Sequence, residues 1–173
     1  MELGNRMRYR FKGLNEYVAK LERLSNRFNT EMCIEIAVDE GAKVVADYTL
    51  KELEKMPVDN TPGKPPMRKS IRSIEKAFLI KEFGTTPLEN KNGYINRKTG
   101  VDRGTLDYDD SGKYYVPAVV LARSLEAGTS FMPKNPVFSR ASRKARKPCL
   151  DAMEKSLNES IEAITRNNLK RSK

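Results

Sequence analysis

The chain has 173 residues, of which 38% are hydrophobic and 32% are charged, so its apolar content suffices for the core of one modest domain. Its 33 lysines and arginines outnumber 23 acidic residues, and the net charge of +10 favours anionic partners. The absence of histidine excludes Ser-His-Asp and Cys-His catalysis, and two cysteines alone cannot form a four-ligand zinc site, so we expect no catalytic residue, no metal and no cofactor.

The N-terminal part predicts an arm followed by a helix. Residues 1–13 alternate basic and apolar side chains, which predicts a basic N-terminal arm that is a short edge strand or becomes ordered only on a partner. Asn15 is a favourable helix N-cap, and apolar side chains from Leu14 to Phe28 recur at helical spacing. A first helix is therefore expected from near Asn15 to Phe28.

A longer helix is predicted to start at Thr30, the next cap candidate, and to run to Met56, where Pro57 ends it. Gly41 and Ala42, in its middle, offer a place where another backbone can pack closely. The apolar positions of this helix form a broad stripe: Cys33, Ile34, Ala37, Val38, Val44, Val45, Tyr48 and Leu53.

The middle of the chain predicts loops and short strands. Residues 57–67 are rich in proline and form a loop, and Ser70 to Phe83 fits either a strand pair or a short helix. Residues 84–112 contain β-like fragments at 93–96 and 105–108 and turn signals at Asn92-Gly93 and Thr99-Gly100. These signals predict a small antiparallel sheet or an extended, partly mobile hairpin.

Two helices are predicted in the C-terminal third. The segment from Tyr114 suits a short helix with Pro117 in its first turn, which Gly128 ends as a left-handed cap. A final helix runs from about Val137 to Leu169, and Pro148 is expected to kink or split it near Lys147. One face of this helix carries Leu150, Met153, Leu157, Ile161 and Ile164.

These elements predict an α+β fold, with long N- and C-terminal helices packed on a small antiparallel β-sheet and a long mobile loop. We expect a single α+β domain over 14–169, with 84–112 as an extended loop or hairpin, between the arm and a basic tail at 170–173. No apolar run approaches the roughly 18–20 residues of a membrane span, and no secretory signal is visible. The chain is therefore expected to fold in a reducing cytosol with Cys33 and Cys149 as free core thiols.

Three segments occur in an order that carries a family resemblance. They are residues 67–71 (Met-Arg-Lys-Ser-Ile), residues 124–130 (Ser-Leu-Glu-Ala-Gly-Thr-Ser) and residues 132–141 (Met-Pro-Lys-Asn-Pro-Val-Phe-Ser-Arg-Ala). From about Leu14 to Ile164 the chain resembles the phage morphogenesis family, the neck and tail-component proteins of long-tailed bacteriophages and prophages. The positions that correspond to the family's motifs are Ser70, Ile71, Glu126, Gly128, Thr129, Pro133, Pro136 and Phe138.

The resemblance implies a structural role without catalysis. It implies a virion protein, assembled in the cytoplasm of the bacterial host, in the neck or tail-completion ring that joins the head to the tail around the DNA channel. The implied partners are copies of itself in a closed ring of about six or twelve subunits, head-connector proteins, and tail-tube or terminator proteins. Non-specific contact with packaged double-stranded DNA is a further implied contact, and no membrane is involved.

Basic residues gather around the predicted start of the last helix. No acidic residue occurs between Ala127 and Leu150, whereas six cations do: Lys134, Arg140, Arg143, Lys144, Arg146 and Lys147. Cations near a helix N-terminus are disfavoured by roughly 0.3–1 kcal/mol each, so a negative group is expected opposite them. The alternatives are DNA phosphates, an acidic surface of a neighbouring subunit, and a solvated face without a partner.

Glu126 stands near the end of the predicted short helix, with no second acid or base near it in the sequence. A catalytic role is therefore disfavoured. Two structural roles remain open: an ion pair with Arg140 or Arg143, and capping of the backbone amides of Gly128 and Thr129.

Two other functions remain open. A cytosolic module that binds nucleic acid non-specifically would use the basic helix and the basic tail. A nuclease or toxin-like enzyme is disfavoured, because Asp107, Asp109 and Asp110 lack the glycine and distal glutamate of a calcium loop. Gly63-Lys64 lacks the remaining frame of a nucleotide-binding loop.

Overall fold

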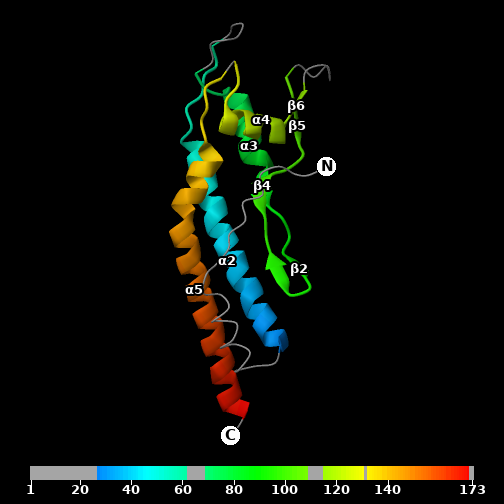
Figure 1. The fold of residues 1–173 in the computed structure, drawn as a ribbon, viewed down its shortest axis with the longest axis vertical. Helices are drawn as coiled ribbons and strands as arrows, with labels where there is room; N and C mark the ends of the chain where they lie inside the picture. The colour runs from blue at the N-terminus through cyan, green and yellow to red at the C-terminus, as the bar shows by residue number, and fades with distance from the viewer. Residues whose placement is uncertain (1–26, 62–68, 109–114, 131, 172–173) are drawn as a thin grey trace. The chain divides into compact units, whose positions relative to one another are not determined.

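A computed structural model describes residues 27–61, 69–108, 115–130 and 132–171, and these adopt the predicted α+β fold (Figure 1). The predicted arm at 1–13, nearly all of the first predicted helix and the end of the basic tail lie outside the described residues. The described elements are α2 (Arg27–Glu54), α3 (Ser73–Glu82), β1 (Phe83–Thr85), β2 (Glu89–Lys91), β3 (Tyr94–Asn96), β4 (Thr99–Val101), β5 (Thr105–Asp107), β6 (Tyr115–Pro117), α4 (Ala118–Ala127) and α5 (Val137–Arg171).

The described residues fall into two compact units. The hairpin unit comprises residues 27–43, 86–98 and 147–171, and the core unit comprises the remainder, within 44–85 and 99–146. Helices α2 and α5 contribute residues to both units. That residues 14–169 form a single domain stays a prediction.

In the hairpin unit, α2 and α5 run antiparallel, since Cys33 is hydrogen-bonded to Ser160 while Gly41 lies against Met153. A Cβ at Gly41 would lie 2.6 Å from Met153 Cγ and 3.1 Å from Cys149 Sγ, so glycine permits this approach. The predicted close packing at Gly41 is confirmed, although its neighbour is a side chain rather than a backbone. Both cysteines are buried free thiols, as predicted, and burial raises the pKa of each.

The antiparallel ladder of β2 with β3 belongs to the same unit. Lys91 pairs with Tyr94, and the two residues between them, Asn92 and Gly93, have φ angles of 55° and 80°. Positive φ at both positions is the signature of a type I′ hairpin turn, so the turn predicted at Asn92-Gly93 is confirmed.

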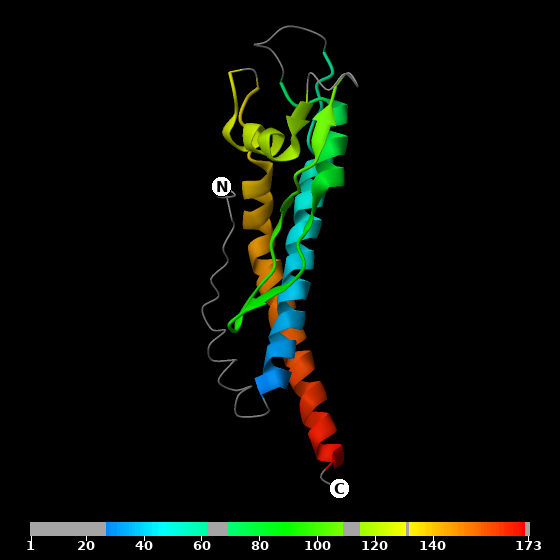
Figure 2. The ribbon, with the colours of Figure 1, turned by 90° about the vertical axis from the view of Figure 1, so that its right-hand side faces the viewer.

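Polar contacts attach this ladder to α2. Arg97 forms an ion pair with Asp39, and Asn90 Nδ2 donates to Glu35 Oε1 at 3.3 Å. The ladder lies beside the blue, N-terminal part of α2 in both views (Figures 1 and 2). Within the segment 84–112, the ladder of β2 with β3 is thus a hairpin, one of the two predicted forms.

In the core unit, β1 pairs with β4 and β5 pairs with β6, both antiparallel. Gly100 lies in β4 opposite Gly84, so the turn predicted at Thr99-Gly100 is wrong. The β-branched Thr99 favours a strand, and Gly100 does not adopt the positive φ that a glycine turn would need.

Helices α3 and α4 lie next to one another in the core unit (Figure 1). Of the segment from Ser70 to Phe83, for which the sequence allowed a strand pair or a short helix, residues 73–82 form the helix α3. Residues 115–117 form strand β6 rather than the first turn of α4, so that part of the predicted helix is wrong. Pro117 is extended, with φ −63° and ψ 139°, and a proline keeps the residue before it extended as well. Helix α4 therefore begins only at Ala118.

The core of this unit contains side chains from α2, α3, α4, α5 and the segment before α3. Its buried members are Leu53, Met56, Ile71, Leu79, Leu121, Leu125 and Val137. This core fixes the C-terminal part of α2 and the first turns of α5, on which the candidate site is built.

The starting point of α2 differs from the prediction. Because the helix begins at Arg27, Thr30 lies inside it with a buried side chain and does not cap it. The apolar stripe is confirmed at Cys33, Ala37, Val45 and Leu53, which are buried.

Helix α5 continues through Pro148, so the predicted split near Lys147 is wrong. A proline removes one backbone hydrogen bond, here to the carbonyl of Lys144, and the remaining hydrogen bonds and the packing of a long helix outweigh that loss. Leu150 is 40% exposed rather than part of the apolar face. The buried stripe runs instead through Cys149, Met153 and Leu157.

Candidate functional site

Glu52 of α2 faces the first turns of α5 and binds two cations of the predicted basic cluster. Its Oε2 accepts a hydrogen bond from Arg140 Nε at 2.7 Å, and its Oε1 accepts one from Lys144 Nζ at 2.6 Å. The Glu52 side chain is 10% exposed, whereas those of Arg140 and Lys144 are 41% and 54% exposed. The negative group expected opposite these two cations therefore belongs to the same chain.

The two cations hold Glu52 in its charged form. The hydrogen bond from Lys144, followed by that from Arg140, lowers the pKa of Glu52 below its ordinary value, although burial acts in the opposite direction. Arg140 also donates from Nη2 to Asn135 Oδ1 at 3.2 Å, which fixes its guanidinium group.

The other cations of the cluster are exposed. Arg143 Nε donates to the carbonyl of Ser139 on its own helix at 3.3 Å. Lys134, Arg146 and Lys147 form no ion pair with a carboxylate within the part of the chain that is described. The six predicted residues thus divide into a pair bound by Glu52 and four that form no ion pair with a carboxylate of the described residues.

Replacing Glu52 with glutamine is expected to lower the free energy of unfolding by about 1–2 kcal/mol, because Arg140 and Lys144 lose a shared carboxylate. The loss stays below that of a fully buried pair because solvent screens both cations. Urea unfolding measures it, with Glu54→Gln on the exposed side of the same helix as control. Equal stability of the two variants would show that the contacts of Glu52 with Arg140 and Lys144 do not stabilise the fold.

Glu126 of α4 caps the first turn of α5. Its Oε1 accepts from the backbone N–H groups of Phe138 at 2.6 Å and Ser139 at 3.2 Å, and its Oε2 accepts from Ser139 Oγ at 2.6 Å. The first N–H groups of a helix lack partners within the helix and form its positive pole, so a carboxylate is favourable there. The amides that Glu126 caps are therefore those of α5. The two expected roles, capping of the Gly128 and Thr129 amides and an ion pair with Arg140 or Arg143, are wrong.

The Glu126→Gln variant is expected to unfold with a free energy lower by about 1–2 kcal/mol, since it loses the negative charge at the helix N-terminus and one acceptor for Ser139 Oγ. The Ser139→Ala variant should lose less, because the two amide contacts remain. A double-mutant cycle on thermal unfolding separates the contributions. Strict additivity of the two changes would show that the contact at Ser139 Oγ contributes nothing.

The turn between α4 and α5 contains four residues of the family resemblance. Gly128 has φ 78° and ψ 166°, and its N–H donates to Ser124 at 2.9 Å. Thr129 N–H donates to the carbonyl of Met132 at 2.9 Å, and Asn135 N–H donates to Leu125 at 2.8 Å. Pro133 is exposed, and the carbonyl of Pro136 accepts from Arg140 N–H at 3.0 Å in the first turn of α5. These contacts set the entry into α5.

Asp59 and Ser70 connect the two described ends of the loop after α2. Asp59 accepts from Thr61 Oγ1 at 2.6 Å, from Thr61 N–H at 3.1 Å and from Lys69 N–H at 2.8 Å. Buried Ser70 donates to the carbonyl of Pro57. The hydrogen bonds, that from Thr61 Oγ1 foremost, lower the pKa of Asp59 from about 3.8 to about 2.

Because its pKa falls on folding, Asp59 stabilises the fold above about pH 4, and this contribution is lost as the pH falls to about 2. The difference in urea midpoint between wild type and Asp59→Asn should therefore be constant above that range and shrink within it. A difference that stays constant down to the lower limit would exclude a charged Asp59 as the group holding this loop.

The segments of the family resemblance meet in the core unit. Ile71, Leu125 and Val137, one from each segment, are fully buried in one core. Phe138 packs on Phe83 with ring centroids 6.3 Å apart. The residues of the resemblance are thus brought together as supports of α4 and α5.

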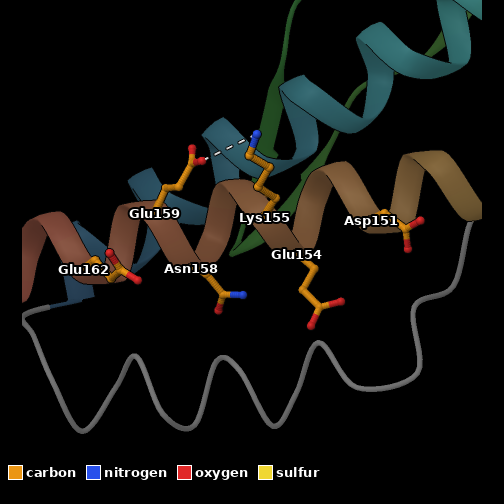
Figure 3. Close-up of a pocket in the computed structure, with 6 residues that line it drawn as sticks. All are labelled: Asp151, Glu154, Lys155, Asn158, Glu159 and Glu162. Carbon is orange, nitrogen blue, oxygen red and sulfur yellow. Dashed lines mark ion pairs between the residues drawn. The ribbon is translucent and has the colours of Figure 1, made fainter.

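An open, shallow hollow in the hairpin unit lies on one face of α5. It is lined by Asp151, Glu154, Lys155, Asn158, Glu159 and Glu162. Figure 3 shows Lys155 paired with Glu159, at 3.8 Å, on one side of the helix, and Asp151, Glu154 and Asn158 directed to another side. Within the described residues, no three His, Cys, Asp or Glu side chains are placed to hold a metal ion.

Sequence reasoning missed Glu52 and Asp59. A signal for Glu52 existed, because it falls at helical spacing with the buried positions Thr49, Leu53 and Met56 and is therefore a carboxylate on an apolar face. The basic cluster on the last helix was the available partner for this carboxylate. Nothing in the local sequence distinguishes Asp59 from an ordinary loop aspartate.

Comparison of the chain with models of known protein families, with curated proteins and with solved structures finds no match in any of the three. Among the described helices, none combines the length and the apolar character that crossing a membrane requires.

Proposed function

We propose that this chain is a structural virion protein of a tailed phage or prophage and forms part of the neck or tail-completion ring that joins the head to the tail around the DNA channel. Copies of the chain meet through a heterologous interface whose rotation closes the ring. Head-connector proteins bind one side of the ring and tail-tube or terminator proteins the other.

The observation that supports this proposal most is that Ile71, Leu125 and Val137, one from each segment of the family resemblance, are buried together in the core of the core unit. The order of the segments carries the family resemblance, and two of their polar side chains serve internal contacts: Glu126 caps α5 and Ser70 binds Pro57. Residues used in this way specify a fold and the placement of its surfaces, as an assembly protein requires.

Exposed apolar side chains of the core unit are candidates for the ring contact. Val120 on α4 and Ile74 on α3 are each 48% exposed. Because the centre of a subunit interface is apolar and depleted of charge, a glutamate at either position opposes association.

The experiment is complementation of a prophage that lacks this gene, with counting of filled heads that carry tails. Wild-type protein should restore joining, and Val120→Glu should not, while Lys55→Glu on an exposed position of the same unit serves as control. Circular dichroism shows whether the variants fold. Normal joining without the gene would refute the role, and joining with Val120→Glu would refute this contact.

A further inference from the structure

The first turns of α5 carry more positive charge than the protein neutralises. In the core unit, residues 134–146 include five cations, and no acidic residue lies between Ala127 and Leu150. Of the carboxylates that reach this segment, Glu126 binds backbone amides and Glu52 binds Arg140 and Lys144. Arg143 and Arg146, in the second and third turns of α5, remain exposed, and neither forms an ion pair with a carboxylate of the described residues.

Helical geometry arranges these cations in one arc. At 100° per residue, the order around the axis is Ala145, Ala141, Lys144, Arg140, Arg143 and Arg146. The two alanines are fully buried, and Lys144 and Arg140 face Glu52. Arg143 therefore lies on the side of the helix opposite the two alanines, and Arg146 lies 60° further round, away from Lys144 and Arg140; both side chains are exposed.

We infer that Arg143 and Arg146 contact the phosphate backbone of double-stranded DNA without reading its sequence. Duplex DNA presents one negative charge per about 1.7 Å, so a row of exposed cations releases its counterions on contact. Glu52 keeps Arg140 and Lys144 on the protein, where they add to the positive field but make no phosphate contact. The inference rests on the proposed function in that a neck ring surrounds packaged DNA.

A second copy of the chain fits this face less well. The chain has 33 lysines and arginines against 23 acidic residues, so a second copy offers few carboxylates to match a basic face. Several carboxylates in the described part already have partners on the same chain, among them Asp39 with Arg97 and Glu89 with Lys98. The exposed residues between Ser139 and Arg146 also include no apolar or aromatic side chain that could anchor a protein partner.

The test measures the salt dependence of binding to a duplex of mixed sequence by fluorescence anisotropy. In the Arg143→Gln, Arg146→Gln double variant, the slope of log binding constant against log salt should be shallower by about 1.8, which is about 0.9 for each lost phosphate contact. The matched control, Lys55→Gln with Lys81→Gln, removes the same charge from exposed positions of the same unit and should keep the wild-type slope. The Arg143→Lys, Arg146→Lys variant should also keep it.

Three results would overturn the inference: no binding of wild type at low salt, an equal loss of slope in the control, and an unchanged slope with loss of head–tail joining. The last would identify an acidic protein surface as the partner. Light scattering on the same proteins separates this inference from the proposed function. If the wild type forms rings and the double variant keeps the wild-type slope, only the DNA contact is refuted. If the double variant has a shallower slope but the wild type forms no rings, only the ring is refuted.

Discussion

Replacing Gly128 with alanine is expected to lower the free energy of unfolding by about 2–4 kcal/mol. The residue has φ 78° and ψ 166°, a region that residues with a Cβ adopt only with strain of order 1–3 kcal/mol. A Cβ there would also lie 2.9 Å from Lys134 N and 3.2 Å from Lys134 Cα, which are backbone atoms that cannot rotate away. Both effects act on the turn that leads into α5.

The control is Gly84→Ala in the same unit, where a Cβ would meet no atom within 4 Å. Chemical denaturation of both variants measures the difference. If the two alanines destabilise the protein equally, the glycine at 128 is dispensable and the turn does not depend on its backbone geometry.

Truncation of Leu125 to alanine should destabilise the protein by about 2–5 kcal/mol, because it removes a fully buried side chain and leaves a cavity between α4, α3 and the start of α5. Because Glu126 is the next residue, the loss of packing at Leu125 also weakens the hydrogen bonds by which Glu126 caps α5. This is the largest effect that a single aliphatic truncation in α4 is expected to have.

Val120→Ala on the same helix provides the comparison, since Val120 is 48% exposed and its truncation should change stability by less than about 0.5 kcal/mol. Urea unfolding followed by circular dichroism resolves the two. A Leu125→Ala variant as stable as Val120→Ala would mean that α4 does not cover the core described for this unit.

Features determined by a few neighbouring residues could be predicted from the sequence. The turn at Asn92-Gly93 needs positive φ at two successive residues, and that pair adopts it readily. The long C-terminal helix and the buried positions Cys33, Ala37 and Val45 follow from periodic apolar residues. Fold class follows from such elements taken together.

Features determined by contacts between distant segments could not be predicted. Glu52 meets Arg140 across 88 positions of sequence, and Glu126 meets Phe138 only because the turn at Gly128 brings α5 back to α4. The strand at 115–117 depends on pairing with β5 as well as on Pro117. The charge pattern indicated that an anion was needed near α5, but only the packing of α2 against α5 identified it.

The claim at the centre of the proposed role is that the chain works by assembling with copies of itself. Light scattering of the purified full chain over a dilution series, with electron microscopy of the most concentrated sample, tests this most directly. The account predicts that the mass rises with concentration to one fixed multiple of the chain and that the particles are closed rings. A mass that stays at that of one chain throughout the series, with no rings in the images, would contradict it.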